Sequence, residues 1–454
     1  MSDDGHSAVS RPGLLDRLLG IFSDVHPGEG ARALLMLANI FLILVAYYVL
    51  KTVREPLILG AEVPDFLERL GIRGPAEVKT YAAAGQALVL MAFVPAYSWF
   101  AARVSRMKLI VGVTIFFAVN ILGFALSVAA GVRFVGIAFY VWVGFFSLSI
   151  IAQFWSYAND IYTKDAGDRL FPVIGIGMTA GTPVGAGLAA RLFAAHASLP
   201  FMLCLAAGLL LLSLAIYAFV NRVNEAPGHA AAPTSNETLA GRNGFALVFA
   251  NPYILLIVAL LVVLNVVNTT GEYILSHLVV ERAQALAAMD AGFDKNAYIG
   301  AFYARYFLWV NVISVVVQAF VTSRLVKYFG LAGVLFALPL IALGAYGFVA
   351  LGATLGVVRW AKIAENSTDY SAMNTARQLL WLPTSRAEKY KAKQAADSFF
   401  VRLGDLVAAL IVFSGTAWAT LDSGGFAVVN LGFVAVWLGL AFVLVRWNHR
   451  LTTA

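Results

Sequence analysis

Charged residues are scarce in this chain. Of its 454 residues, 13% are charged and 61% are hydrophobic, whereas a typical soluble domain has about 25% charged and about 45–50% apolar residues. This composition excludes an ordinary soluble protein and predicts a polytopic membrane protein whose environment is the lipid bilayer. The net charge of +7 is then expected in loops that orient the helices. No nucleic acid is expected as a partner.

Cysteine and histidine are scarce as well. Cys204 is the single cysteine and lies in an apolar run, which excludes an internal disulfide and a thiolate metal site. The six histidines are scattered, and none form a pair at ligand spacing. We therefore expect no metal and no cofactor. No nucleophile–base pair stands out either, which argues against a membrane enzyme.

The start of the chain lacks the features of a targeting sequence. Residues 1–30 have no basic start, short apolar core or small-residue cleavage site of a signal peptide. Acidic residues such as Asp3 and Asp4 also distinguish the segment from a transit peptide. We expect a cytoplasmic N-terminal tail over 1–30 that contains an amphipathic segment from Leu14 to Phe22.

Long apolar runs, in contrast, are abundant. Each run is long enough for one bilayer crossing, and together they cover 31–58, 78–101, 107–130, 134–160, 170–194, 199–220, 251–278, 297–321, 330–352, 354–381, 394–419 and 425–446. The break between the sixth and seventh runs is rich in Pro, Ala, Gly, Ser and Asn, which suits a flexible linker.

These runs predict an all-α membrane protein of about twelve transmembrane helices in two six-helix halves. We expect an N-terminal half at 31–221, a cytoplasmic linker at 222–250, a C-terminal half at 251–446 and a cytoplasmic tail at 447–454. Two related six-helix halves are the architecture of the major facilitator fold, with its site between the halves near the membrane midplane.

Basic residues mark one side of the predicted bundle. The loops on that side contain Arg103, Arg106, Lys108, Lys164, Arg169, Arg222, Arg242, Arg324, Lys327, Arg386, Lys389, Lys391, Arg446 and Arg450. The opposite loops are poorer in net positive charge. The positive-inside rule therefore predicts a multi-pass protein of the bacterial cytoplasmic (inner) membrane with both termini and the linker in the cytoplasm.

The first apolar run carries three charges, Lys51, Arg54 and Glu55. An ionisable side chain at the centre of a spanning helix costs roughly 2.5–3.5 kcal/mol on insertion scales, so it faces a cavity or a partner. The alternative is that the two cations lie near the helix end and extend to the interface.

The seventh run repeats this pattern weakly. The segment 269–275 parallels 52–58, so that Glu272 corresponds in placement to the charges of the first run. We expect Arg54 and Glu272 to act as an opposed pair across the two halves, in which Glu272 competes with the substrate for Arg54.

The tenth run places Lys362, Glu365 and Asp369 within one narrow stripe at 100° per residue. Such a face does not look at lipid. Two interpretations remain open. The stripe is either a structural ladder of ion pairs between helices or part of the wall of a polar cavity.

Three further runs contribute polar side chains. The fourth has Ser149, Gln153, Tyr157 and Asp160 on one face, with Asn159 next to Asp160, as a cavity wall or as polar contacts between helices. The eighth has Arg305 one turn from Trp309, where an Arg would stack on a planar substrate ring or on its neighbour. The eleventh has Lys393, Arg402 and Asp405, of which some are expected to be loop charges.

The fifth run has glycines at 177, 181 and 185, a spacing that allows close helix packing. Taken together, the intramembrane cations outnumber the acids that would neutralise them, and Lys51, Arg54, Arg305, Lys362 and Arg402 are expected to converge on one cavity. Because Arg and Lys suit phosphate oxygens, the residues predict an alternating-access carrier of a small anionic solute.

Three segments resemble the ATP/ADP translocase family of plastids and intracellular bacteria. Residues 50–57, LKTVREPL, are similar to the family pattern Leu-Arg-x-x-Lys-Asp-x-Leu. Residues 154–161, FWSYANDI, followed by the glycines at 175 and 177, resemble Phe-Trp-x-Phe-Ala-Asn-x-Ile and its Pro-x-x-Gly-x-Gly continuation. Residues 374–383 and 393–404 resemble the family segment from Asp-Pro-Thr-Lys-Glu to Arg-Leu-Gly-Lys.

The resemblance implies a nucleotide carrier, typically exchanging ATP for ADP, on a major-facilitator-like scaffold. It also implies that the family's first-helix Lys corresponds to Arg54, its seventh-helix Glu to Glu272 and its Gly-Lys-Ala-Ala Lys to Lys393. One departure is Asp405, which stands where the family has Lys after Arg-Leu-Gly. A nucleotide other than ATP, or a smaller phosphorylated anion, is therefore also compatible.

Two alternatives stay open at this stage. One is a major-facilitator transporter of an unrelated solute, proton-coupled through Glu272, Glu365 or Asp369. The other is a non-transporting membrane protein. The sequence sets neither the direction of transport nor the oligomeric state.

Overall fold

The computed structural model describes residues 24–26, 29–101, 103–224, 244–385 and 388–453. These residues form helices and no strand. Most of the expected tail over 1–30, including the segment from Leu14 to Phe22, and most of the expected linker lie outside the described residues. A short helix, α9 (Gly244–Ala250), occupies the end of the stretch that was predicted as linker.

The helices agree closely with the predicted runs. The first half comprises α2 (Gly30–Leu59), the short α3 (Asp65–Glu68), α4 (Pro75–Ala101), α5 (Arg106–Ala129), α6 (Val135–Ile161), α7 (Lys164–Ala194) and α8 (Leu199–Asn224). The second half comprises α10 (Pro252–Met289), α11 (Lys295–Val316) with η1 (Val317–Thr322), α12 (Ser323–Ala350), α13 (Leu355–Thr368) with η2 (Asp369–Met373) and α14 (Asn374–Leu380), η3 (Glu388–Ala392), α15 (Lys393–Ala395) with η4 (Ala396–Phe400) and α16 (Val401–Ala417), and α17 (Ser423–Thr453).

Twelve bilayer crossings follow from these helices. Within the described residues, nine helices are long and apolar enough to span a membrane, but one of them, Lys295–Ala350, has 56 residues. It bends at Gly330, whose φ of 59° and ψ of −145° are not helical, so it makes two crossings. The helix α4 and the segment α13–α14 occupy the second and tenth predicted runs and complete the set.

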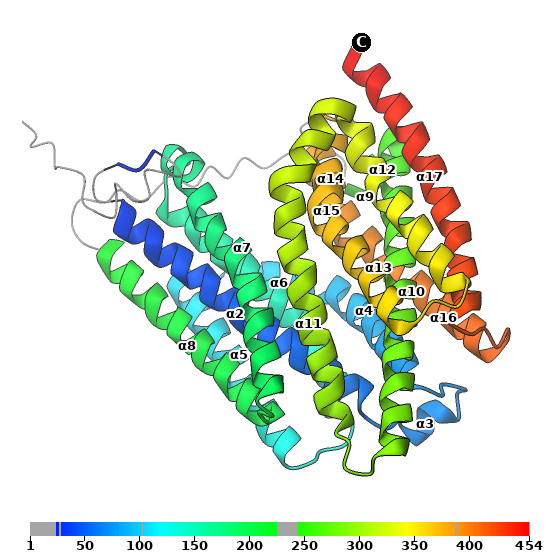
Figure 1. The fold of residues 1–454 in the computed structure, drawn as a ribbon. Helices are drawn as coiled ribbons and strands as arrows, with labels where there is room; N and C mark the ends of the chain where they lie inside the picture. Colours follow the sequence, from blue (N-terminus) through cyan, green and yellow to red (C-terminus); the bar gives the residue numbers. More distant parts are fainter. Residues whose placement is uncertain (1–23, 27–28, 102, 225–243, 386–387, 454) are drawn as a thin grey trace, which may run out of the picture.

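The two halves pack side by side (Figure 1). In the first half, α2 packs along α7 and α8, and in the second, α10 packs along α16 and α17. The halves meet where α7 and α2 contact α11, and where α4 contacts α16 and α10. This pairing puts α2, α4, α10 and α11 at the junction, which includes the charged segment of α2 and Glu272 of α10.

The glycines of α7 bring it against α2. A Cβ added at Gly181 would lie 2.9 Å from the Leu44 Cβ and 2.9 Å from the Phe41 carbonyl oxygen, and one at Gly185 would lie 2.9 Å from the Tyr48 Cβ. The prediction that these glycines permit close packing is confirmed. The close approach fixes the position of the charged part of α2 relative to α7.

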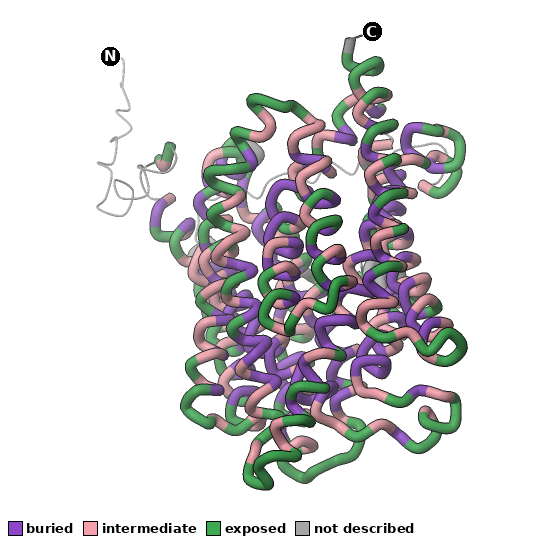
Figure 2. The backbone as a smooth tube through the Cα atoms, turned by 45° about the vertical axis from the view of Figure 1, so that its right-hand side comes forward, coloured by how far each residue is buried: buried purple, intermediate pink, exposed green. Residues whose placement is uncertain are grey.

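Apolar side chains cover the outside of the bundle. Leu126 on α5 is 72% exposed and Leu410 on α16 is 65% exposed, as expected for helices that face lipid chains. Buried residues lie along the inner sides of the helices, and exposed ones follow the loops and the outer sides (Figure 2).

The start of α2 and the end of α17 lie on the same side of the bundle, at the top of Figure 1. We call this side the terminal face. The side at which α2 ends and α11 begins is called the opposite face.

Candidate functional site

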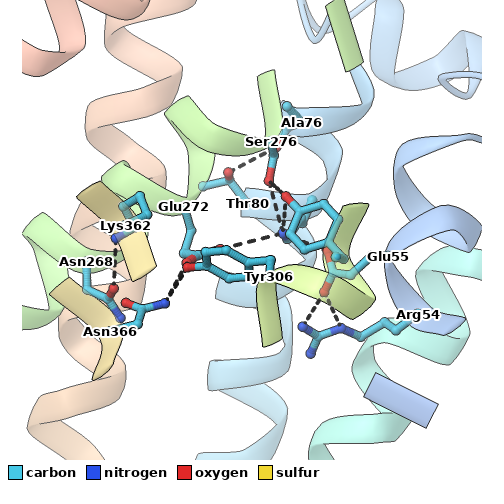
Figure 3. A network of polar contacts seen from close by, with 12 residues as sticks. Arg54, Glu55, Ala76, Thr80, Asn268, Glu272, Ser276, Tyr306, Lys362 and Asn366 are labelled. Carbon is cyan, nitrogen blue, oxygen red and sulfur yellow. Dashed lines mark hydrogen bonds and ion pairs between the residues drawn. The ribbon is translucent and has the colours of Figure 1, made fainter. Parts of the chain in front are cut away.

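Buried charges gather at the junction of the two halves (Figure 3). Glu55 on α2 is fully buried. Its Oε1 accepts a 2.6 Å ion-paired hydrogen bond from the Arg54 guanidinium, and its Oε2 lies 2.8 Å from the Lys79 ammonium on α4. One carboxylate thus neutralises parts of two cations within the first half.

Lys79 links the first half to the second. Its Nζ donates to the Ser276 hydroxyl on α10 at 2.9 Å and lies 3.9 Å from a Glu272 carboxylate oxygen. The sequence analysis did not single out Lys79, because it stands beside Glu77 at the edge of an apolar run and resembles a loop charge. Its place inside the run 78–101 was the one available signal.

Glu272 lies on α10 and takes its hydrogen bonds from its own half. Its Oε1 accepts from the Tyr306 hydroxyl at 3.0 Å and from the Asn366 amide at 3.0 Å. The expected direct pair with Arg54 is not what the structure contains, since Lys79 lies between the two residues. The sequence similarity between α2 and α10 did not indicate that α4, which carries Lys79, also lies at the junction.

Lys362 and Glu365 form a buried ion pair on α13, with 3.0 Å between the ammonium and the carboxylate. They are 2% and 3% exposed. The Tyr346 hydroxyl donates to Glu365, and Lys362 donates to the Asn268 side chain. In this conformation the two residues correspond to the ion-pair interpretation.

Asp369, the third residue of the predicted stripe, has a different partner. It accepts a 2.9 Å hydrogen bond from the Arg377 guanidinium two turns further along. The stripe is therefore divided between two ion pairs.

Lys51 differs from the other cations of the junction. Its ammonium lies 4.5 Å from the ring centroid of Phe307, 5.2 Å from that of Tyr48 and 6.0 Å from that of Tyr370. No carboxylate of the described residues lies within ion-pair distance of it. Tyr48 belongs to the first half and the other two rings belong to the second, so Lys51 lies at the junction. Its side chain is partly exposed.

The charges of the network balance, apart from Lys51. The cations are Arg54, Lys79 and Lys362, and the acids are Glu55, Glu272 and Glu365. The expected surplus of cations is thus reduced to Lys51, because each of the other three cations lies within 4 Å of at least one of these carboxylates.

Three predicted residues lie near the terminal face, away from this network. The network reaches α6 at Tyr140, whose ring lies 4.3 Å from the Arg54 guanidinium carbon. Tyr157 follows 17 residues later, roughly 25 Å along the helix at 1.5 Å per residue, and packs edge-on against Tyr217 of α8. Asn159 and Asp160 follow in the last turn of α6. The expectation that these residues share one site with Arg54 is corrected accordingly.

The remaining predicted cations also lie elsewhere. Arg305 is exposed and donates to the Ala301 carbonyl of its own helix, because two residues of helix turn it about 160° from the buried Tyr303. Arg402 pairs with Asp405 at 3.4 Å. Lys393 donates to the Gln378 side chain, so it ties α15 to α14.

The surroundings of Asp405 account for an acid at the position where the family pattern has Lys. Its Oδ1 accepts from the Asn265 amide at 2.7 Å and the Thr269 hydroxyl at 2.8 Å, both on α10. A lysine in the same rotamer would place a donor against two donors. Here the acid joins α16 to α10.

Curated proteins give distant sequence matches, and no protein-family model matches the chain. It is 24% identical over 339 residues to "ADP,ATP carrier protein 1" of Chlamydia trachomatis, which covers 64% of this chain and 61% of the carrier. It is 27% identical over 222 residues to "ADP,ATP carrier protein 1" of Chlamydia pneumoniae, covering 43% of this chain and 41% of the carrier. The matched regions span less than two thirds of these carriers.

Solved structures show the fold. The nucleoside transporter NupG superposes with a TM-score of 0.61 at 14% identity, over 91% of this chain and 98% of its own. The peptide transporter PepTSo, of the POT family, gives 0.62 at 11% identity, over 93% and 98%. A bacterial homologue of Spinster gives 0.59 at 13% identity, over 93% and 98%. The chain is thus a multi-pass all-α membrane protein with the major facilitator fold, and its sequence is distantly similar to those of the Chlamydia ADP,ATP carrier proteins.

Proposed function

We propose that the protein is an alternating-access carrier for a nucleotide or a related phosphorylated anion. The observation that supports this most is Lys51, a cation without a carboxylate partner among the described residues, set among aromatic rings of both halves. An ammonium suits a phosphate oxygen, and aromatic rings suit a planar base. The names of the Chlamydia relatives point to the same class of substrate.

The neighbouring ion pairs suggest how binding is coupled to movement. An anion bound at Lys51 lies one helical turn from Arg54 and competes with Glu55 for its guanidinium. Glu55 then interacts more strongly with Lys79, which draws that ammonium away from Glu272 and Ser276 in the other half. A ligand shifts a conformational equilibrium only through such differential contacts.

Uptake into proteoliposomes tests the proposal. Vesicles loaded with ADP or left empty are given labelled ATP, ADP, other nucleotides and sugar phosphates. Uptake of one of these anions that needs a counter-anion inside supports an exchanger. Accumulation of a different solute driven by an imposed pH gradient, with none of these anions present, would favour the proton-coupled transporter, for which Glu272, Glu365 and Asp369 are the candidate acids.

We further propose that the terminal face is cytoplasmic and that the membrane is the bacterial inner membrane. The supporting observation is the excess of Lys and Arg in the loops of that face. In this orientation the substrate reaches the junction network alternately from the cytoplasm and from the periplasm.

A further inference from the structure

Three arginines line one groove on the opposite face of the second half. They are Arg282 at the end of α10, Arg305 on α11 and Arg359 near the start of α13. The groove has a volume of about 480 Å³ and no acidic residue among those that line it. No described carboxylate lies within ion-pair distance of the three side chains. The groove therefore concentrates positive charge that the described part of the protein leaves unneutralised.

The arginines retain unused donors. Arg305 donates its Nε to the Ala301 carbonyl oxygen at 3.3 Å, which leaves its terminal nitrogens for another acceptor. The Arg359 Nε is buried and has no hydrogen-bond partner among the described residues. A buried guanidinium donor without an acceptor is unfavourable, so an oxygen-rich ligand would satisfy it.

The start of α13 adds further donors. Thr354, Leu355 and Gly356 line the groove, and the Thr354 side chain makes no capping hydrogen bond. The first N–H groups of a helix lack partners within the helix and favour an anion. Backbone and side-chain donors thus converge on one place.

The groove continues into a surface that faces the membrane. Trp309, one turn deeper on α11 than Arg305, packs against Trp360 with 5.8 Å between ring centroids. The two rings are 41% and 48% exposed. Trp360 lies about 160° around α13 from the buried Lys362, so it points outward. Exposed Trp rings below a basic groove are the environment of a lipid at the interface.

We propose that this groove binds the phosphate of an anionic phospholipid, whose acyl chains lie along Trp309 and Trp360. Guanidinium groups bind phosphate oxygens in bidentate pairs. A net-negative headgroup is favoured over phosphatidylethanolamine, because the ammonium of the latter would face three arginines and no acid. The site is separate from the junction network and does not depend on what the protein transports.

Lipid titration of the purified full-length chain tests this site. Native mass spectrometry would compare phosphatidylglycerol with phosphatidylethanolamine on the wild type, Arg305→Gln and Arg359→Gln. We expect the wild type to prefer phosphatidylglycerol and each variant to bind it about tenfold more weakly, as for the loss of one charged hydrogen-bond pair. Arg324→Gln is the matched control, since Arg324 is also exposed and also donates to the carbonyl four residues before it.

Two results would overturn the proposal. One is equal phosphatidylglycerol binding by the wild type and both variants. The other is displacement of the lipid by inorganic phosphate or ATP at millimolar concentration, which would make the groove a site for soluble anions. If either variant does not purify as a folded monodisperse protein, Arg282→Gln, which changes another exposed arginine of the groove, takes its place with the same expected result.

Discussion

At the scale of single residues, Lys79 is the centre of the buried network. It contacts carboxylates of both halves, at 2.8 Å from Glu55 and 3.9 Å from Glu272. Removal of one member of a buried ion pair leaves an uncompensated charge and costs about 3–5 kcal/mol. Lys79 therefore contributes both to the stability of this conformation and to the contact between the halves.

Lys79→Met is expected to lower the melting temperature of the purified protein and to abolish uptake. The double variant Lys79→Met/Glu272→Gln should recover part of the stability, because the half-buried Glu272 carboxylate, whose only described cation within 4 Å is Lys79, is then replaced by a neutral amide. Lys108→Met, a change of an exposed lysine, is the control. A melting temperature of Lys79→Met equal to that of the control would contradict the role of Lys79.

Lys51→Gln separates substrate binding from stability. Because Lys51 has aromatic neighbours and no described carboxylate partner, its removal should leave the melting temperature almost unchanged while uptake falls at least tenfold. Lys51→Arg should keep part of the uptake. Arg54→Gln, which breaks the 2.6 Å pair with Glu55, should reduce both quantities. Normal transport by Lys51→Gln would remove the main support for the proposed substrate site.

The sequence identifies charged residues in the membrane, but it does not identify their partners. Glu55 and Lys362 stand out because each lies inside an apolar run. Lys79 does not stand out, since it begins one. Which acid meets which cation depends on how the helices cross. The spacing of Gly181 and its neighbouring glycines predicts close packing, but it does not identify α2 as the partner helix. Arg305 illustrates the same limit, because two residues of helix separate an inward from an outward position.

At the scale of helices, the contact of α7 with α2 sets the position of the charged segment. Gly181→Ala would put a methyl group 2.9 Å from the Phe41 carbonyl oxygen and the Leu44 Cβ, and such overpacking typically costs about 1–3 kcal/mol. Gly175→Ala on the same helix meets nothing within 4 Å and should be neutral or slightly stabilising. The melting temperatures of both variants are measured by thermal unfolding, monitored by size-exclusion chromatography. Equal melting temperatures would mean that the contact of α7 with α2 accommodates a methyl group at Gly181 without loss of stability.

Helix positions were predicted well because a bilayer imposes length and apolarity on every crossing. Both ends of α2 and α5 fall within one residue of the predicted runs 31–58 and 107–130. The helix α17, Ser423–Thr453, begins two residues before the predicted run 425–446 and extends about two turns beyond it. The bend at Gly330 between the eighth and ninth crossings also falls where the sequence places the boundary between two runs. Helix α9 was missed, since seven residues at the end of a polar stretch are too few for a periodic signal.

At the scale of the whole molecule, the orientation in the membrane follows from the loops. Reporter fusions after Ala454 and within residues 222–244 should both give a cytoplasmic signal, because the basic loops lie on the terminal face. A fusion in the loop between α10 and α11, at Gly292, should give a periplasmic signal. A periplasmic signal at Ala454 would invert the proposed orientation and place the lipid groove in the inner leaflet.

Alternating access requires the halves to separate at the opposite face during each cycle. In this conformation they touch there. A Cβ built on Gly60, at the end of α2, would overlap the side chain of Asn296 at the start of α11. Cysteines at these two positions are therefore placed to form a disulfide between the halves, provided that Cys204 is replaced by Ala.

Oxidation of the Gly60→Cys/Asn296→Cys protein should stop uptake, and reduction should restore it, because the disulfide keeps the opposite face closed. The two single-cysteine proteins control for modification, and they should transport equally before and after oxidation. Cross-linking is measured by the shift in mobility after cleavage of the chain between the two positions. If the fully cross-linked protein transports at the rate of its reduced form, the halves do not separate at this face, and the carrier mechanism proposed for the junction network would be wrong.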